Sequence, residues 1–160
     1  MPGTAPAATV PLTRPAEEVM HTPSHQPATS RQSAKPAATS SRKVTEHKSF
    51  GNADEIREFT NGRAEIVKIS GGEVGRYVFS PGWHWSRDVK PIAMTQSCEV
   101  PHFNYHISGT LAVRMDDGTE FLAGPGDITS LPSGHDAWVV GNEPVVIVDF
   151  HGASDYAKKS

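Results

Sequence analysis

The sequence predicts an all-β domain, a sandwich or closed barrel of short strands, preceded by a disordered segment. Three observations lead to this prediction. Apolar and polar residues alternate over much of residues 60–150, which is the period of a half-buried strand. Turn-forming Gly, Pro, Asn and Asp residues interrupt the alternation roughly every 8–10 residues. Helical periods are missing from this region, so many short strands in packed layers are the expected architecture.

The first part of the chain, residues 1–48, is expected to form a disordered, low-complexity tail. The first 50 residues hold 7 of the 13 prolines, and Phe50 is their only aromatic residue. Such a segment buries too little apolar surface to offset the entropy lost on folding. Its six Lys and Arg residues are scattered, which favours a solvated linker over a surface for nucleic acid or anionic lipid. The folded domain is expected at residues 49–153, followed by a short polar tail at 154–160.

The charge and cysteine content narrow the classes of partner. After residue 50, nine Lys or Arg residues stand against fifteen Asp or Glu, which argues against a nucleic-acid groove. No run of 18 apolar residues occurs, so no membrane partner is expected. Cys98 is the only cysteine, so an internal disulfide is excluded, and the N-terminus lacks the pattern of a secretory signal. Both features favour a cytoplasmic location.

The expected elements follow in order along the chain. Asn52, followed by three acidic residues, favours a short helix at 52–60. Alternation predicts strands at 62–70 and 73–80. Further short strands are separated by turns at Ser108-Gly109, Asp117-Gly118, Gly124-Pro125-Gly126, Pro132-Ser133-Gly134 and Gly141-Asn142. Asp117-Gly118 is the strongest hairpin signal among them, because Asp-Gly suits a tight primed turn.

The stretch SCEVPHFNYHISG has two interpretations. Cys98, His102 and His106 are spaced four apart, as on one face of a helix. However, Pro101 lacks the N–H that a helix interior needs, and aromatic or β-branched residues follow at every second position. A strand is therefore predicted, on which His102, Asn104 and His106 share one face. The placement of Cys98, before the proline, is left open.

Two motifs in this region resemble those of the cupin superfamily, which consists of small double-stranded β-helix (jelly-roll) barrels. GDITSLPSG, with Gly126, Pro132 and Gly134, fits the frame of the second cupin motif, G(X)5PXG(X)2H(X)3N. In the first motif, G(X)5HXH(X)3–4E(X)6G, His102 takes the glutamate position when counted back from Gly109. PGWHWSRDVKPI and PSGHDAWVVGNEP are also similar to a bacterial cupin subgroup without an assured activity. The resemblance covers about residues 60–150 and implies a cupin-type jelly-roll barrel, often a homodimer.

The histidines of the cupin motifs are replaced in this chain. Gln96 and Cys98 stand where the first motif has its histidine pair, about eight residues farther from Gly82 than the motif allows. Ala137 stands at the histidine position of the second motif, and His135 lies two residues earlier, on the same strand face. The metal site that the resemblance implies is therefore either rebuilt or lost.

Cys98, His102 and His135 are the candidate metal ligands, and His106 and Gln96 are the candidates for a fourth. Imidazole and thiolate donors suit a divalent transition metal such as zinc, iron, nickel, manganese or copper. Three protein ligands would leave one coordination position open. The alternative is that Cys98 is a small buried hydrophobic residue and the histidines are hydrogen-bonded in a polar cavity.

A small-molecule site is predicted beside these ligands. Aromatic walls with one cation fit a small planar or anionic ligand, although the same aromatic side chains also suit packing at a barrel end or a dimer interface. The candidate ligand-binding residues are Trp83, Trp85, Lys90, Gln96, Asn104 and Trp138.

Two functions remain open from the sequence. The first is a metal-dependent enzyme of the oxygenase, isomerase, lyase or cyclase type, with His106 as the catalytic proton shuttle. The second is a non-catalytic module that binds or senses a small molecule without a metal. A thiol nucleophile is less favoured, because Cys98 and His102 lack an identifiable third group that would orient the base.

Overall fold

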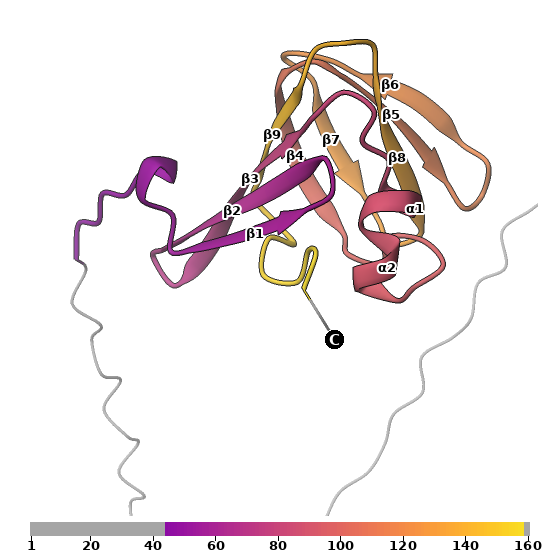
Figure 1. The fold of residues 1–160 in the computed structure, drawn as a ribbon. Helices are drawn as coiled ribbons and strands as arrows, with labels where there is room; N and C mark the ends of the chain where they lie inside the picture. The colour runs from indigo at the N-terminus through magenta and orange to yellow at the C-terminus, as the bar shows by residue number, and fades with distance from the viewer. Residues whose placement is uncertain (1–43, 159–160) are drawn as a thin grey trace, which may run out of the picture. The chain divides into compact units, whose positions relative to one another are not determined.

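The computed structural model describes residues 44–158 and consists of two β-sheets with two one-turn helices beside them (Figure 1). The disorder expected for residues 1–48 falls on residues outside this range, apart from residues 44–48, which form neither helix nor strand and are exposed. Within the described range, none of the helices is long and apolar enough to cross a lipid bilayer.

The elements begin with a 3₁₀ turn at Phe50–Asn52. Two α-helices, α1 (Trp85–Asp88) and α2 (Lys90–Ala93), lie between the third and fourth strands. The strands of the described part are β1 (Glu55–Phe59), β2 (Gly62–Ile69), β3 (Gly72–Phe79), β4 (His102–Ser108), β5 (Thr110–Met115), β6 (Glu120–Ala123), β7 (Ile128–Leu131), β8 (His135–Val140) and β9 (Val145–Asp149).

The strand pairs are nested along the chain. The β5–β6 hairpin is innermost, β4 pairs with β7 around it, and His84 forms a bridge to Trp138 of β8 outside that pair. The β3–β9 pair encloses them all. The strands assemble into one sheet with the order β1-β2-β3-β9-β4-β7 and a second with the order β6-β5-β8. A long hairpin of nested antiparallel pairs folded over into two sheets is the jelly-roll arrangement, so the predicted all-β, cupin-type double-stranded β-helix is confirmed.

The apolar core lies between the two sheets, because each sheet turns alternate side chains inward. On β4 the inward positions are His102, Asn104 and His106, as predicted, while Phe103 and Tyr105 on the outer face are about half exposed. The core residues of the larger sheet include Ala64, Ile66, Tyr77, Phe79, Val145 and Ile147, and those of the smaller sheet include Leu111, Val113, Ala137 and Val139.

The prediction of a short helix at 52–60 is wrong. Residues 55–59 form β1, which pairs with β2 through a two-residue turn at Thr60 and Asn61. Asn61, the second residue of this turn, adopts the left-handed conformation with a φ of 57°, which asparagine tolerates better than most residues. Pairing with β2 outweighs the local helix signal, because a helix of about nine residues is marginal without tertiary support.

The structure describes the segment expected to be a short polar tail, residues 154–160, as far as residue 158. Residues 153–157 form a turn, called the closing turn below, and Tyr156 in this turn is only 3% exposed. The Tyr156 ring stacks on Tyr77 of β3 with a centroid separation of 4.6 Å. The closing turn therefore contributes to the core.

Glu65 is an acidic side chain on β2 that is buried and paired with Arg76 and Arg63. Burial is the largest influence and disfavours its ionised form, but the hydrogen bonds from the two arginines prevail, so the pKa of Glu65 lies below its usual value. A lowered pKa in the folded state stabilises the protein above about pH 4.5, the range of an unfolded glutamate, and this contribution is lost as the pH falls through the folded pKa.

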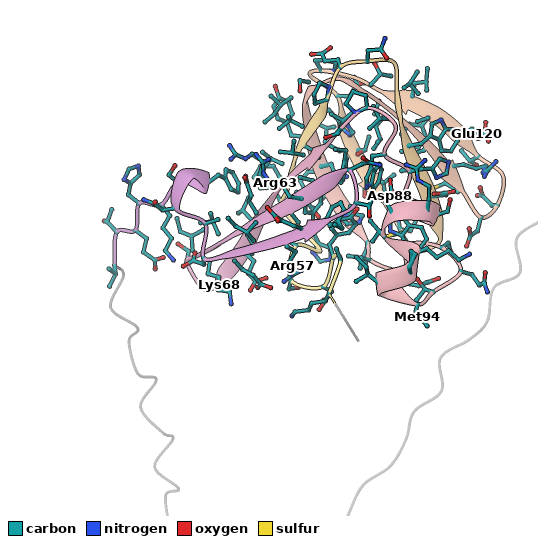
Figure 2. The ribbon with its side chains drawn as sticks, viewed as in Figure 1. Arg57, Arg63, Lys68, Asp88, Met94 and Glu120 are labelled. Atoms are coloured by element: carbon teal, nitrogen blue, oxygen red, sulfur yellow. The ribbon has the colours of Figure 1, made fainter. Side chains whose placement is uncertain are left out.

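We therefore expect Glu65→Gln to lower the free energy of unfolding by about 1 kcal/mol at pH 7, a value kept small because both arginines are partly exposed. Urea denaturation at pH 7 and below pH 4.5 measures this, and the gap between variant and wild type should narrow in acid. Glu120→Gln, in an exposed pair with Arg114, is the matched control and should change little (Figure 2). A constant gap across this pH range would contradict the interpretation.

Candidate metal centre

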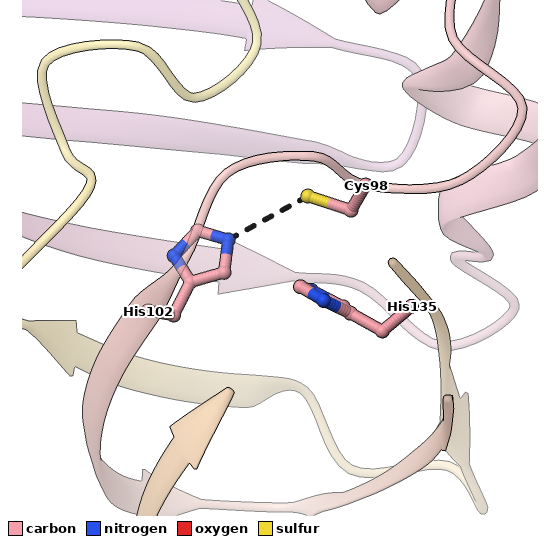
Figure 3. A group of neighbouring side chains, drawn as sticks. All are labelled: Cys98, His102 and His135. Carbon is pink, nitrogen blue, oxygen red and sulfur yellow. Dashed lines mark hydrogen bonds between the residues drawn. The ribbon is translucent and has the colours of Figure 1, made fainter. Parts of the chain in front are cut away.

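Three side chains with metal-binding atoms converge, as Figure 3 shows. His102 begins β4, His135 begins β8, and Cys98 lies in the segment before β4. All three are buried, and one ligand atom from each lies within 4.8 Å of the others. The structure therefore brings together the three residues predicted as metal ligands from the sequence.

His102 is oriented by a buried carboxylate. Its Nδ1 lies 2.7 Å from Oδ2 of Asp149, the last residue of β9. A carboxylate can only accept a hydrogen bond, so Nδ1 carries a proton and Nε2 is the ring nitrogen left to bind a metal. That Nε2 lies 3.7 Å from Sγ of Cys98. Asp149 is itself held by the Tyr77 hydroxyl, which donates to Oδ2 at 2.8 Å. A histidine held by a carboxylate in this way is the usual arrangement of metal-binding histidines.

His135 is oriented by the backbone. Its Nδ1 donates to the carbonyl of Pro132 at 3.0 Å, which leaves Nε2 without a proton and free to bind a metal. Burial, and secondly the neighbouring His102, lower the pKa of His135 to about 4. The ring is therefore neutral at pH 7, which is the form that binds metals.

Cys98 is placed by a backbone bridge to the start of β8. Its N–H donates to the His135 carbonyl at 2.7 Å, and its own carbonyl accepts from the Gly134 N–H at 2.8 Å. This bridge sets the thiol beside both histidines. Burial, as the largest influence, raises the pKa of the Cys98 thiol to about 12. The free protein therefore carries a protonated thiol, whose proton a metal would displace on binding.

A small cavity of about 30 Å³, called the inner cavity below, adjoins His102 and His135. This volume holds one or two water molecules, whereas pockets for small molecules usually measure about 300–1,000 Å³. Trp83, Trp85 and Asn104, three of the predicted ligand-binding residues, are among the residues that line it. The interior is therefore nearly filled by side chains.

The other predicted ligand-binding residues lie elsewhere. The Lys90 ammonium donates to the exposed Gln96 side chain at 3.1 Å, and neither residue lines the inner cavity. Trp138 points outward from β8, because its neighbours Ala137 and Val139 take the inward positions, and it stacks on the ring of His84. Gln96, the other candidate for a fourth ligand, is exposed, whereas Cys98, His102 and His135 are buried.

His106, predicted to be the proton shuttle, is buried on the same face of β4 as His102 but does not line the inner cavity. Four residues of strand separate the two histidines by about 13 Å along the chain. The His106 Nε2 instead lies 3.1 Å from the Thr129 hydroxyl oxygen, and burial lowers the pKa of its imidazole. Its contacts are those of a core histidine.

Sequence reasoning missed two residues of this centre, Asp149 and Tyr156. Asp149 follows Val145 and Ile147 at inward positions of β9, so an acid on the buried face was readable from the alternation. Its partner His102 is 47 residues away in the chain, and no local pattern links them. Tyr156, whose ring meets His102 edge-on at 5.4 Å, lies after the last strand and carries no comparable signal.

No protein-family model matches this chain, and a comparison with curated proteins finds no relative. Among solved structures, an oxalate decarboxylase of Lactobacillus farciminis matches with 18% identity and a TM-score of 0.46, over 64% of this chain and 32% of that one. A single-residue variant of oxalate decarboxylase from Bacillus subtilis matches with 17% identity and a TM-score of 0.48, over 74% and 33%. A cupin-like protein from Thermotoga maritima matches with 17% identity and a TM-score of 0.42, over 70% and 82%.

The chain thus spans about a third of the length of these two decarboxylases. At such identities and TM-scores, the matches carry no information about activity. The nested strand order and the cluster of Cys98, His102 and His135 together define a cupin-type barrel with a set of potential metal ligands.

Proposed function

We propose that this chain is a cupin-type protein that binds one divalent transition metal through Cys98, His102 and His135. The observation that carries the proposal is the convergence of one sulfur and two nitrogen donors within 4.8 Å of one another. Both imidazoles donate a hydrogen bond from Nδ1, to Asp149 and to the Pro132 carbonyl, so Nε2 of each ring is the nitrogen placed to bind a metal.

The donor set fits a borderline metal ion. One thiolate and two imidazoles suit zinc, iron(II), nickel or copper, whereas calcium and magnesium prefer oxygen ligands. Three protein ligands leave a coordination position for water or another small ligand, and the inner cavity provides that space. A bound metal would supply Lewis-acid chemistry at this position.

The surrounding residues have roles that do not depend on the reaction. Asp149 and Tyr77 fix the ring of His102, and the backbone bridge fixes Cys98 relative to His135. Tyr156 and Trp85 are buried and line the inner cavity, so they limit the water beside His102 and His135. Exclusion of water strengthens the electrostatic interactions of the charged thiolate with a cation.

Zinc titration of metal-free protein tests this proposal. We expect about one zinc ion per chain, and a gain of about 2.7 kcal/mol in the free energy of unfolding when free zinc is 100 times its Kd. Isothermal calorimetry and urea denaturation measure these quantities. Cys98→Ser and His135→Gln should each lose tight binding, while His47→Gln, at an exposed histidine outside the cluster, should bind like the wild type. Equal binding by all four proteins would refute the site.

A non-catalytic metal-binding module is favoured over an enzyme by one observation, the small volume of the inner cavity. In cobalt-loaded protein, a closed centre predicts that azide leaves the visible absorption spectrum unchanged. A centre with an accessible open position predicts that azide shifts the spectrum, because the anion binds the metal directly. The two outcomes show whether a small anion reaches the metal.

A further inference from the structure

A second cavity, called the outer cavity below, lies between the two short helices and the closing turn. Its volume is about 280 Å³, close to the lower end of the range of about 300–1,000 Å³ for small-molecule pockets. Apolar side chains from α1, α2 and the closing turn form much of its wall, and Cys98 is part of its lining. The apolar wall consists of Trp85, Val89, Ala93, Val100, Tyr156 and Ala157.

The outer cavity leads to the metal centre. Trp85 and Tyr156 line both the outer and the inner cavity, so these two side chains separate them. Cys98 lines the outer cavity, yet its Sγ lies 3.7 Å from Nε2 of His102. Within the described residues, the hydroxyl of Tyr156 is buried without a hydrogen-bond partner. A bound molecule with a polar group that reached this hydroxyl would supply its missing partner.

Arg57 of β1 fastens the closing turn. Its guanidinium donates to the carbonyls of Ala153, Ser154 and Tyr156 at 3.0, 3.0 and 2.5 Å. The Arg57 side chain is only 9% exposed, so these hydrogen bonds are largely shielded from water. The wall that carries Tyr156 is therefore held in place by Arg57, a side chain of β1 at the edge of the larger sheet (Figure 2).

We propose that the outer cavity is the binding pocket through which a small, largely apolar molecule approaches the metal centre, and that Arg57 positions the closing turn over it. This inference rests on the proposed function. The chemical class follows from the wall, which is apolar and includes the indole of Trp85, while the charged side chains Glu99, Asp155 and Lys158 are exposed. A strongly charged molecule would lose its hydration in such a pocket without a buried partner.

Labelling of Cys98 in the metal-free full-length chain tests the route and the ligand class together, because Cys98 is the only thiol. Benzyl methanethiosulfonate transfers its benzylthio group to the thiolate sulfur and releases methanesulfinate, and the thiol proton goes to solvent. The negatively charged 2-sulfonatoethyl reagent reacts in the same way. For each reagent, the labelling rate of the folded protein is divided by that of the urea-unfolded protein. We expect this ratio to be about tenfold higher for the benzyl reagent. Equal ratios would overturn the ligand class.

Substitutions in the wall test the route itself. Ala93→Phe fills the outer cavity and should slow benzyl labelling by about tenfold, whereas Ala53→Phe, at a half-buried alanine outside both cavities, should leave the rate unchanged. Arg57→Gln should speed labelling by a larger factor than its measured loss of unfolding free energy accounts for. The control Arg63→Gln should show no such excess in its labelling rate. Unchanged rates in Ala93→Phe and Arg57→Gln would overturn the route.

Zinc distinguishes this inference from the proposed function. Zinc should protect Cys98 of the wild type from both reagents, because the thiolate would be bound to the metal. If zinc gave no protection, the metal centre would be contradicted. The effect of Ala93→Phe on labelling of the metal-free protein would still support the outer cavity as the route. Full protection without any effect of Ala93→Phe would overturn the outer cavity as the route and leave the metal centre intact.

Discussion

Asp149→Asn is expected to weaken zinc binding by about 10- to 100-fold, the range found when the hydrogen-bond partner of a metal-binding histidine is removed. The carboxylate is fully buried and accepts hydrogen bonds from His102, the Tyr77 hydroxyl and the backbone N–H groups of Phe103 and His151. An amide offers one acceptor oxygen and turns a donor toward some of these groups. His102 would then lose the partner that fixes its proton on Nδ1.

The same substitution should lower the free energy of unfolding by about 3 kcal/mol, because buried donors are left without an acceptor. Calorimetric titration with zinc and urea denaturation of the metal-free protein measure the two effects separately. Tyr77→Phe is the matched control, since it removes one of the four hydrogen bonds and leaves the carboxylate beside His102. It should cost about 1–2 kcal/mol and change zinc affinity far less. Wild-type zinc affinity in Asp149→Asn would contradict the role of Asp149.

Gly152→Ala is expected to destabilise the fold by about 3 kcal/mol or more, because strain and steric overlap act together. Gly152 has a φ of 100°, a conformation that residues with a side chain rarely adopt. An added Cβ would lie 2.3 Å from the Pro101 carbonyl oxygen and 3.3 Å from Nδ1 of His102. A backbone oxygen cannot rotate away, so the start of β4 would have to shift, and zinc affinity should fall as well.

Gly118→Ala separates the two causes. Gly118, in the β5–β6 turn, has a similar φ of 91°, but an added Cβ would meet nothing within 4 Å. Only the backbone strain remains, so we expect a loss of about 1–2 kcal/mol and unchanged zinc affinity. Urea denaturation and zinc titration of both variants measure the difference. Equal losses in the two variants would show that the contact between residue 152 and Pro101 does not constrain β4.

Much of the fold could be predicted from local patterns. Alternation in GRAEIVKIS and EVGRYVFS predicted β2 and β3, and Asp117-Gly118 predicted the β5–β6 hairpin. These signals are local, because both the inward face of a strand and the shape of a turn depend on neighbouring residues. The failure at 52–60 had the opposite cause, since β1 depends on its partner strand β2 rather than on its own helix signal.

The candidate site also contains residues whose positions local patterns predict and residues whose positions they do not. His102 and His135 were placed on inward faces by alternation, and the jelly-roll resemblance brought their strands together. Lys90 and Gln96 lie outside strands, where spacing does not fix the direction of a side chain, and their side chains contact each other. Asp149 and the closing turn depend on register and packing across the barrel, which a single sequence does not specify.

X-ray absorption at the zinc edge of the zinc-loaded full-length chain tests the metal centre most directly, because it reports the atoms bound to the metal. The account predicts one sulfur at about 2.3 Å and two imidazole nitrogens at about 2.0–2.1 Å from the zinc ion. Any further ligand atom should be oxygen or nitrogen. In Cys98→Ser the sulfur contribution should disappear. A zinc shell of nitrogen and oxygen alone in the wild type would contradict the assignment of Cys98, His102 and His135 as the metal ligands.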